Sequence, residues 1–414
     1  MLAEPLLAND NLEVAVSIVM PCLNEKQSLP HCVANAREAL ALIEARYGLG
    51  GEVVVADNGS TDGSQALAIQ LGARVVDVCA KGYGAALIGG FEQAYGRFLV
   101  MGDADGSYDF TDAVAMVGRL LDGADLCMGS RFEGGIGAGA MPWKNRYIGN
   151  PALTGILNLF FRTGVDDAHC GLRAIRREAY GELALQSCGM EFASEMVIKA
   201  SLRCLRIDQV PATLSPDLRD RAPHLRPWRD GWRHLRYLFM LSPTWAFGVP
   251  AAAALLFGAV LLLAASIQYL HPGVFPAIGP YWTLLGSASV DVGHQALLFG
   301  MSGNLYGVRA GYRRGSWMVA RRISLEAMLV AGLALITAGC VILALVAYGW
   351  VNRDFQAARS ILPPVLGTLA CILGFQTMLG GLLMAIIGGN EAQFGAAARI
   401  SPAGHRTSEG RRLA

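Results

Sequence analysis

The segment Phe98-Leu99-Val100-Met101-Gly102-Asp103-Ala104-Asp105-Gly106-Ser107 places two carboxylates directly after a short apolar run. The run from Phe98 to Met101 is typical of a buried strand, so the acidic turn is expected at a strand end. Hard divalent cations take oxygen ligands of this kind and often bridge to substrate phosphates. Because acidic turns after strands are common, the pair indicates a metal site only in the company of other motifs.

Strand and helix signals alternate on both sides of this segment. Other β-branched or apolar runs predict strands at Val14 to Met20, Glu52 to Ala56, Arg74 to Val78 and Asp125 to Gly129. Helical patterns lie between them at Gln27 to Arg46, Asp62 to Leu71, Gly84 to Tyr95 and Phe110 to Leu121. This order favours an α/β fold with a mostly parallel sheet covered on both faces. Ligands of such sheets bind beyond the carboxyl ends of the strands.

The first predicted strand ends in Met20-Pro21-Cys22-Leu23-Asn24-Glu25. Pro21 fixes the angle at which the chain leaves the strand, and Asn24 and Glu25 offer polar groups to a ligand. Taken alone, the motif is equally typical of an ordinary turn between a strand and a helix.

Two further motifs follow the second and third predicted strands. In Ala56-Asp57-Asn58-Gly59-Ser60-Thr61-Asp62-Gly63, Ser60 and Asp62 are typical helix caps, whereas Asp57 is the better candidate for a nucleotide hydroxyl or base. In Ala80-Lys81-Gly82-Tyr83-Gly84-Ala85-Ala86, a cation and two glycines precede a helix. Backbone amides and the helix dipole favour an anion there, although the signal is weak by itself.

In order and spacing, these motifs resemble the family 2 glycosyltransferases, whose nucleotide-sugar-binding fold is called GT-A, and in particular the dolichyl-phosphate mannose and polyprenyl-phosphate glucose synthases. The resemblance covers roughly residues 14–240 and rests on Pro21 to Glu25, Asp57 to Gly63, Lys81 to Ala86, Asp103 to Asp105 and Cys170 to Ala174. The joint occurrence of these motifs is far more specific than any one of them.

For the donor, the resemblance implies a nucleoside pocket lined by Pro21, Asn24, Glu25 and Asp57. It implies that Lys81 lies beside this pocket, and that Asp103 and Asp105 hold Mg²⁺ or Mn²⁺ against the diphosphate. Ser107 matches a weaker third ligand position. Asn58 stands where the family often has a second Asp, which puts only that contact in doubt.

For the acceptor, the resemblance implies phosphate-binding arginines and a nearby carboxylate. Arg131, Arg146 and Arg173 match arginines expected near the acceptor phosphate or donor diphosphate, where a planar guanidinium binds well. Glu195 matches a carboxylate near the acceptor, although a solvated Glu in a first helical turn is the alternative. The glycine-rich loop Gly134 to Ala140 has the composition of a mobile segment that closes over the donor.

The second half of the chain is dominated by apolar residues. A bilayer core needs about 20 such residues in a helix, and four spans are predicted at Thr244 to Leu270, Tyr281 to Gly307, Ile323 to Trp350 and Ile361 to Gly388. The connection between the second and third spans contains Arg309, Arg313, Arg314, Arg321 and Arg322, whereas the other two connections contain only Arg353 and Arg359. The positive-inside rule therefore predicts a cytoplasmic catalytic half.

Two polar features accompany these spans. Asp291, His294 and Gln295 lie near the middle of the second span, where we expect Asp291 and His294 to pair with each other or with a neighbouring helix, unless this segment is partly interfacial. The segment Leu218 to Tyr237 mixes arginines with Trp and Tyr, which suits a helix on an anionic membrane surface or a simple positive stop before the first span.

The predicted organisation is a GT-A catalytic domain, an interfacial juxtamembrane segment, an all-α transmembrane region of four helices and a cytoplasmic tail, at residues 1–215, 216–243, 244–390 and 391–414. The N-terminus, Met1 to Glu13, lacks the pattern of a secretory signal. The 9 cysteines form no Cys-x-x-Cys pair and are expected to be reduced. The net charge of +1 gives no indication of a nucleic-acid partner, and a homo-oligomer is left open.

The expected reaction transfers a hexose from UDP-glucose or GDP-mannose to a polyisoprenyl phosphate, with inversion as the resemblance implies. The sequence does not choose between the two donors. Transfer to a lipid hydroxyl or a growing polysaccharide is the nearest alternative, but Arg229-Asp230-Gly231-Trp232-Arg233 reverses the Arg-Trp order of the Gln-x-x-Arg-Trp motif usual in polymer synthases. A non-catalytic membrane scaffold and a transporter are the alternatives from other classes.

Overall fold

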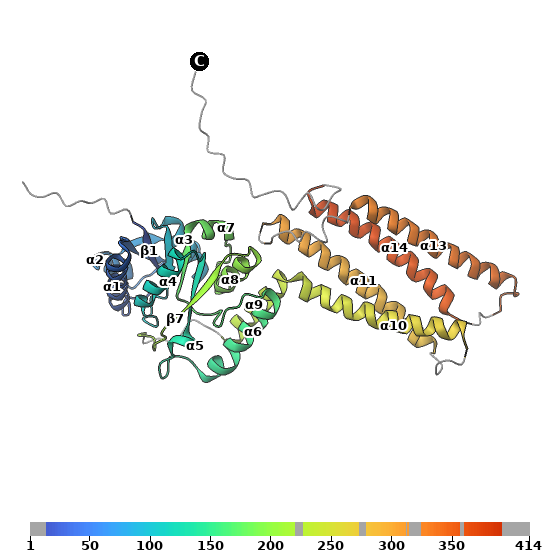
Figure 1. The fold of residues 1–414 in the computed structure, drawn as a ribbon, viewed down its shortest axis with the longest axis horizontal. Helices are drawn as coiled ribbons and strands as arrows, with labels where there is room; N and C mark the ends of the chain where they lie inside the picture. The colour runs from blue at the N-terminus through green and yellow to red at the C-terminus, as the bar shows by residue number, and fades with distance from the viewer. Residues whose placement is uncertain are drawn as a thin grey trace, which may run out of the picture. The chain divides into compact units, whose positions relative to one another are not determined.

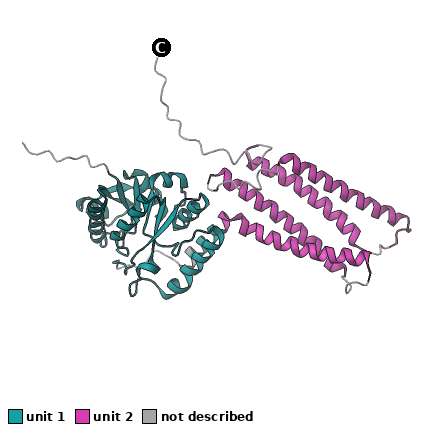
Figure 2. Cartoon of the chain, viewed as in Figure 1, with its two compact units in different colours: residues 1–238 teal, residues 239–414 magenta. Residues whose placement is uncertain are grey.

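The computed structural model describes residues 14–219, 227–272, 279–311, 313, 324–356 and 360–390, with the backbone alone over 227–230. The chain forms two compact units, Met1–Leu238 and Phe239–Ala414 (Figure 2). Their boundary falls within the predicted juxtamembrane segment 216–243. The predicted tail 391–414, the N-terminal segment 1–13 and Arg221, Arg226, Arg314, Arg321, Arg322 and Arg359 lie outside the described residues.

The first unit is built around a central β-sheet (Figure 1). This sheet has 7 strands in the order β3-β2-β1-β4-β6-β5-β7. Only β6 runs antiparallel to its neighbours, so the predicted mostly parallel sheet is confirmed. The strands are β1 (Val16–Cys22), β2 (Gly51–Asp57), β3 (Arg74–Asp77), β4 (Phe98–Met101), β5 (Leu126–Ser130), β6 (Arg173–Arg176) and β7 (Ile207–Pro211). The first five lie within two residues of their predicted bounds, whereas β6 and β7 were not predicted.

Helices cover both faces of this sheet. Those of the first unit are α1 (Leu29–Tyr47), α2 (Ser64–Gln70), α3 (Tyr83–Gln93), η1 (Phe110–Asp112), α4 (Ala113–Leu121), α5 (Arg131–Gly134), η2 (Asn145–Gly149), α6 (Asn150–Phe161), α7 (Arg177–Leu183) and α8 (Phe192–Leu202). A further helix, α9 (Pro227–Leu241), runs across the unit boundary. The four helices predicted between residues 27 and 121 are present, the last of them as η1 followed by α4.

Alternation along β1 assigns the two faces. Ile18 and Met20 belong to the hydrophobic core that includes the buried residues of α1 and α4. Val19 points the other way because successive strand side chains alternate, and it meets α3 at Gly90. A Cβ added at Gly90 would lie 2.5 Å from Val19 Cγ1, so glycine is what permits this close packing.

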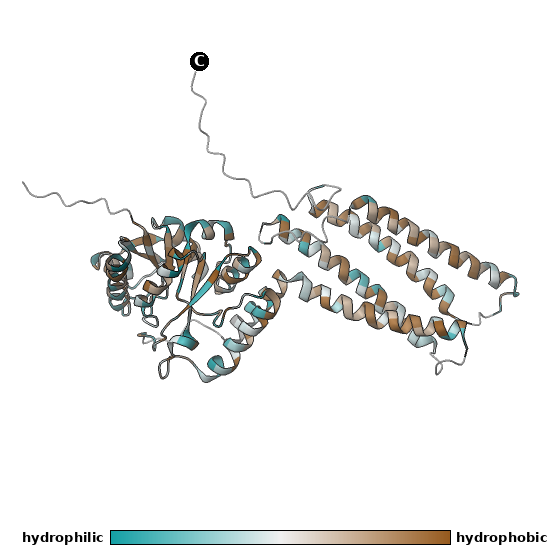
Figure 3. Cartoon of the chain, in the orientation of Figure 1, coloured by the Kyte–Doolittle hydropathy of each residue, from teal (hydrophilic) through white to brown (hydrophobic). Residues whose placement is uncertain are grey.

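The second unit consists of long helices: η3 (Thr244–Gly248), α10 (Val249–Leu270), α11 (Pro280–Arg309), α13 (Leu325–Val351) and α14 (Leu362–Ile387). Figure 3 shows them as predominantly hydrophobic. Three helices of the described residues are long and apolar enough to cross a membrane, namely Thr244–Leu270, Leu325–Val351 and Leu362–Ile387.

The predicted four-span arrangement is not confirmed, because α11 does not meet the same criterion. Its polar residues are the reason for the difference, and they bind α14. Gln376 Nε2 donates to Asp291 Oδ1 at 2.7 Å, while Gln376 Oε1 lies 2.8 Å from His294 Nδ1. Thr377 Oγ1 lies 3.2 Å from His294 Nε2. Asp291 and His294 therefore pair with a neighbouring helix, as one of the two sequence interpretations expected.

Candidate active site

The turns after β1 and β2 are joined by hydrogen bonds from backbone amides of each turn to side-chain oxygens of the other. Asn24 N donates to Ser60 Oγ at 2.9 Å, and Thr61 N donates to Asn24 Oδ1 at 2.8 Å. Asp62 accepts hydrogen bonds from Ser64 N and Lys26 N, each at 3.0 Å. These contacts agree with structural roles for Ser60 and Asp62. The carboxamide oxygen of Asn24 accepts one of these hydrogen bonds, so Asn24 shapes the turn.

Pro21 lies inside the end of β1, where it is partly buried and pairs in register with Ala56. The prediction placed it just after the strand, and the two extra residues of β1 account for the difference. Because β1 and β2 are parallel neighbours, Cys22 and Asp57 lie opposite each other at their ends. The two motifs thus share one edge of the sheet.

Asp57 is 1% exposed, and its two carboxylate oxygens differ sharply. Oδ2 accepts hydrogen bonds from Gly59 N and Ser60 N at 3.0 Å and from Gln65 Nε2 at 2.6 Å. Burial favours the neutral acid, but the donors of Ser60 and Gln65 outweigh it and hold the pKa of Asp57 below its usual value. Oδ1 is buried with no hydrogen-bond partner among the described residues. A buried acceptor of this kind is suited to a donor group of a ligand.

Asn58 organises the following loop in a way that an Asp is not able to reproduce. Its Nδ2 donates to the carbonyls of Val78 at 3.1 Å and Ala80 at 2.6 Å, while its Oδ1 accepts from Gly82 N at 2.8 Å. Lys81 Nζ in turn donates to Asn58 O at 2.7 Å. The amide at this position therefore holds Lys81 and its loop against the end of β2.

The glycines of the Lys81 motif serve close packing. A Cβ on Gly82 would lie 2.1 Å from Cys188 O, and one on Gly84 would lie 2.1 Å from Ser187 O. Ala85 N donates to Cys188 O at 3.1 Å. Two amides of the motif, Gly82 N and Ala85 N, are thus bonded within the protein, and anion binding at the start of α3 stays a prediction.

Asp103 and Asp105 follow β4, as predicted. Asp105 Oδ1 accepts hydrogen bonds from Ser107 N at 3.0 Å and Ser107 Oγ at 2.6 Å. Burial raises the pKa of Asp103 to about 7, and the negative charge of Asp105 adds to this effect, whereas a hydrogen bond with Tyr83 opposes it. Asp105 is buried, Asp103 is partly exposed, and the two carboxylates lie close enough to repel each other.

This donor set fits a hard divalent cation, because two oxygen ligands with mutual repulsion gain from a shared positive charge. Within the part of the chain that is described, no group of three or more His, Cys, Asp or Glu side chains forms a metal cluster. Asp103 and Asp105 would therefore supply only part of a coordination shell, and substrate oxygens and water would complete it. Ser107 Oγ is already a donor to Asp105, so it is a weaker candidate ligand.

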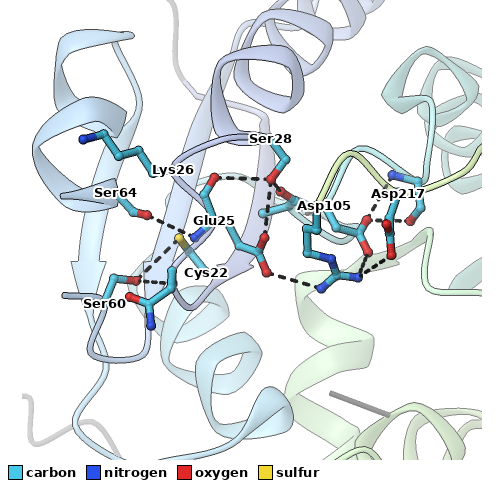
Figure 4. Close-up of polar contacts among 12 residues, drawn as sticks. Cys22, Glu25, Lys26, Ser28, Ser60, Ser64, Asp105 and Asp217 are labelled. Atoms are coloured by element: carbon cyan, nitrogen blue, oxygen red, sulfur yellow. Dashed lines mark hydrogen bonds and ion pairs between the residues drawn. The ribbon is translucent and has the colours of Figure 1, made fainter. Parts of the chain in front are cut away.

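Sequence reasoning missed a cation at this position, Arg219. Its guanidinium contacts Asp105 Oδ2, Glu25 Oε1 at 3.3 Å and Asp217 Oδ2 at 3.4 Å (Figure 4). Burial disfavours its charge, but Asp105 and Glu25 raise its pKa above the usual value. No local pattern distinguishes Arg219 from the other arginines of the predicted juxtamembrane segment, so this contact was not predictable.

Two predicted phosphate-binding arginines are buried in protein contacts. Arg131 is 7% exposed and forms a bidentate pair with Asp167, with Nε–Oδ2 at 2.6 Å and Nη2–Oδ1 at 2.7 Å. Arg173 is fully buried and donates to the carbonyls of Cys170, Ala193 and Ala168. These contacts favour structural roles, so direct phosphate binding by either residue stays a prediction. Arg146, in η2, is partly exposed.

Glu195, the predicted acceptor-side carboxylate, is also engaged. It is 2% exposed, pairs with Lys199 Nζ at 2.7 Å and accepts hydrogen bonds from Gln186 N and Ser187 N. The Tyr237 hydroxyl of α9 is hydrogen-bonded to the same carboxylate. Glu195 therefore positions the 186–188 loop and α9 and is not available as a general base in this state.

The doubly covered α/β sheet, with carboxylates at the ends of β2 and β4, has the architecture of a GT-A domain. Residues 17–184 match the model of glycosyl transferase family 2, and residues 301–388 match the C-terminal transmembrane region of family 2 glycosyltransferases. The chain belongs to glycosyl transferase family 2 and is a membrane-associated glycosyltransferase.

Its similarity to one relative extends over most of the chain. It is 34% identical over 390 residues to the low-salt glycan biosynthesis hexosyltransferase Agl6 of Haloferax volcanii, covering 92% of this chain and 91% of that protein. It is 30% identical over 215 residues to the polyprenol monophosphomannose synthase of Mycolicibacterium smegmatis, covering 48% of this chain and 76% of the relative.

A solved structure of Mycobacterium tuberculosis glucosyl-3-phosphoglycerate synthase with Mn²⁺, UDP and glucosyl-3-phosphoglycerate aligns with 58% of this chain and 84% of its own, at 23% identity and a TM-score of 0.41.

Proposed function

We propose that this glycosyltransferase moves a hexose from a nucleotide diphospho-sugar, UDP-glucose or GDP-mannose, to a polyisoprenyl phosphate, with inversion at the anomeric carbon. One observation supports the donor half of the proposal. Asp57, whose Oδ1 has no hydrogen-bond partner among the described residues, and the Asp103–Asp105 pair lie at the carboxyl ends of β2 and β4, which both run parallel to β1. These groups suit a nucleoside that donates a hydrogen bond and a diphosphate bound through a divalent metal ion. The similarity to a polyprenol monophosphomannose synthase supports the acceptor half.

In the proposed donor site, Asp57 Oδ1 accepts a hydrogen bond from the nucleoside, while Pro21, Asn24 and Glu25 form the adjacent wall. Lys81 lies beside this wall through its contact with Asn58. Asp103 and Asp105 would hold Mg²⁺ or Mn²⁺, which when bound neutralises charge on the departing nucleoside diphosphate. Ser107 keeps Asp105 oriented for this role.

A phosphate acceptor is consistent with the ion pair and hydrogen bonds that already occupy the Glu195 carboxylate. A phosphate monoester oxygen is already ionised near neutral pH, so its attack on the anomeric carbon requires no strong general base. An acceptor hydroxyl would require one, and Glu195 is bonded to Lys199 and two backbone amides. The cations Arg131 and Arg146 stay candidates for the acceptor phosphate, with Arg131 dependent on a change in its pairing with Asp167.

We further propose four membrane spans with the catalytic unit in the cytoplasm. Inside the second unit, Arg313 Nη2 donates to Leu241 O at 3.1 Å, and Arg309 Nη1 donates to Ile387 O at 3.0 Å. Arg309, the last residue of α11, and Arg313, just beyond it, therefore contact the end of the helical unit at which the chain enters from α9. The positive-inside rule assigns such an end to the cytoplasmic side. The segments 1–215, 216–243, 244–390 and 391–414 remain the proposed domain plan.

The transfer reaction tests this proposal. Membranes containing the protein receive undecaprenyl phosphate, Mg²⁺ or Mn²⁺, and either UDP-[¹⁴C]glucose or GDP-[¹⁴C]mannose. We expect label from one donor in a lipid that mild acid hydrolyses, with the label lost on adding EDTA or in Asp105→Asn, and retained in the surface control Asp208→Asn. Label in polymer or in an acid-stable lipid would contradict the proposal and favour a hydroxyl acceptor.

A further inference from the structure

The segment that follows β7 is fastened to the acidic turn by its backbone. Leu218 N donates to Asp105 O at 2.9 Å, and Ser215 N donates to Ser107 O at 2.8 Å. Gly106 has a φ of +79°, and a Cβ there would lie 2.7 Å from Leu218 Cδ1. The chain therefore carries Arg219 to the acidic turn by a defined path, and its contact there is not that of a freely rotating surface side chain.

The charges around Arg219 are unbalanced. Its side chain is 17% exposed and contacts the carboxylates of Glu25, Asp105 and Asp217. Asp103 adds negative charge nearby, since it too raises the pKa of Arg219. The Nε of Arg219 is buried without a hydrogen-bond partner among the described residues. A guanidinium with an unsatisfied buried donor is only partly matched to its surroundings.

Arg219 contacts the carboxylate oxygen that is best placed for a metal ion. The two hydrogen bonds from Ser107 are directed to Asp105 Oδ1, whereas Oδ2 receives the guanidinium. A divalent cation bound through Oδ2 would place a second cationic group at the oxygen that the guanidinium already contacts. Their repulsion makes the two modes of binding mutually exclusive.

We propose that Arg219 occupies the place of the divalent cation when the donor is absent, and that it transfers to the diphosphate of the donor when metal and nucleotide bind. A planar guanidinium binds phosphate oxygens through two parallel hydrogen bonds, which would satisfy the Nε that lacks a partner. Arg219 thus opposes binding of the metal alone and favours binding of the metal together with a nucleoside diphosphate. This inference rests on the proposed donor site and requires nothing of the acceptor.

The proposal can be tested because loss of Arg219 should strengthen binding of the metal alone and weaken binding of the nucleotide. We would titrate the purified full-length protein and Arg219→Gln in the same detergent, first with Mn²⁺ alone, followed by electron paramagnetic resonance, and then with UDP or GDP at saturating Mn²⁺, followed by calorimetry. For Arg219→Gln we expect Mn²⁺ alone to bind tighter by on the order of tenfold. We expect the nucleotide to bind weaker by on the order of tenfold.

Two further variants separate charge and geometry from general damage. Arg219→Lys retains the positive charge, so its Mn²⁺ affinity should stay near that of the natural protein while its nucleotide affinity falls. Arg119→Gln removes an exposed arginine that lies 4.0 Å from Asp208, and it should change neither affinity.

Parallel weakening of both ligands in Arg219→Gln, or no change in either, would overturn the proposal, because a purely structural arginine predicts one of these results. No lipid acceptor is present in these titrations. A failure here is therefore distinguishable from a failure of lipid glycosylation, which the transfer assay measures.

Discussion

Asp57 holds the turn after β2 with one carboxylate oxygen and leaves the other for a ligand. The isosteric change Asp57→Asn keeps an acceptor toward Gly59, Ser60 and Gln65 but turns the open position into a donor. We expect nucleoside diphosphate affinity to fall by roughly 10- to 100-fold, since a hydrogen bond to a charged group contributes about 1.5–3 kcal/mol. Calorimetric titration with UDP and GDP measures this. Unchanged affinity for both would place the nucleoside elsewhere.

Arg131 and Asp167 form a buried bidentate pair whose members depend on each other. Asp167→Asn leaves the Arg131 charge buried without its anion, which costs about 3–5 kcal/mol in comparable buried pairs. The exposed pair Arg119–Asp208, at 4.0 Å, supplies the control Asp208→Asn, for which we expect a change within about 0.5 kcal/mol. Chemical denaturation of the two variants makes the comparison. Equal stabilities would show that the buried pair is not a determinant of folding.

The sequence predicted the positions of the carboxylates of the site but not the partners of its arginines. Asp57, Asp103 and Asp105 were predictable because each follows an apolar strand, and a parallel sheet brings such ends to one edge. The partners of Arg131 and Arg173 were not predictable, because they depend on which carboxylate or carbonyls the fold buries beside them. Arg219 was overlooked for the same reason.

At the scale of elements, α3 joins the 186–188 loop to the acidic turn. Gly82 has a φ of +132° and lies against Cys188 O, while the next residue, Tyr83, is hydrogen-bonded to Asp103. We therefore expect Gly82→Ala to displace Tyr83 and weaken Mn²⁺ binding in the presence of UDP or GDP. Gly181→Ala in α7 is the matched control, because a Cβ there meets nothing within 4 Å. Equal metal binding by both variants would disprove the coupling of α3 to the acidic turn.

The polar contact between α11 and α14 is a second element-scale feature. Gln376→Leu removes the side chain that bridges Asp291 and His294. We expect the helical unit to lose about 0.6 kcal/mol and at most about 1.7 kcal/mol, the mean and the maximum for interhelical hydrogen bonds in a membrane protein. Thermal unfolding in detergent tests this against Thr337→Ala, which removes a hydroxyl that donates to Leu333 O of its own helix. A Gln376→Leu variant as stable as the control would make the bridge energetically neutral.

Elements with a clear local pattern were well predicted, and elements defined by distant pairing were not. The first five strands follow apolar runs, whereas β6 is a four-residue strand inserted antiparallel between β4 and β5. The sequence of Arg173–Arg176 does not predict a strand at that position, because it has only two apolar residues between two arginines. Likewise, the composition of α11 does not show that α14 satisfies its polar groups.

At the scale of the whole molecule, the proposed orientation makes a topological prediction. Protease added to sealed inverted vesicles should digest the catalytic unit, because its sheet would face the outside of such vesicles, whereas the same unit in right-side-out vesicles should be protected. Immunodetection of the first unit, with detergent-opened vesicles as the control, distinguishes the two. Protection in inverted vesicles would reverse the assignment that Arg309 and Arg313, at the C-terminal end of α11, support.

The central claim is transfer of a hexose to a polyisoprenyl phosphate, and competition between acceptors tests it most directly. Purified protein would receive its donor, Mg²⁺, and equal amounts of undecaprenyl phosphate and undecaprenol, with the products identified by mass spectrometry. The account predicts a product with the mass of undecaprenyl phosphate plus one hexose, none from undecaprenol, and none from Asp105→Asn. A hexosyl-undecaprenol product, or chains of several hexoses, would contradict it.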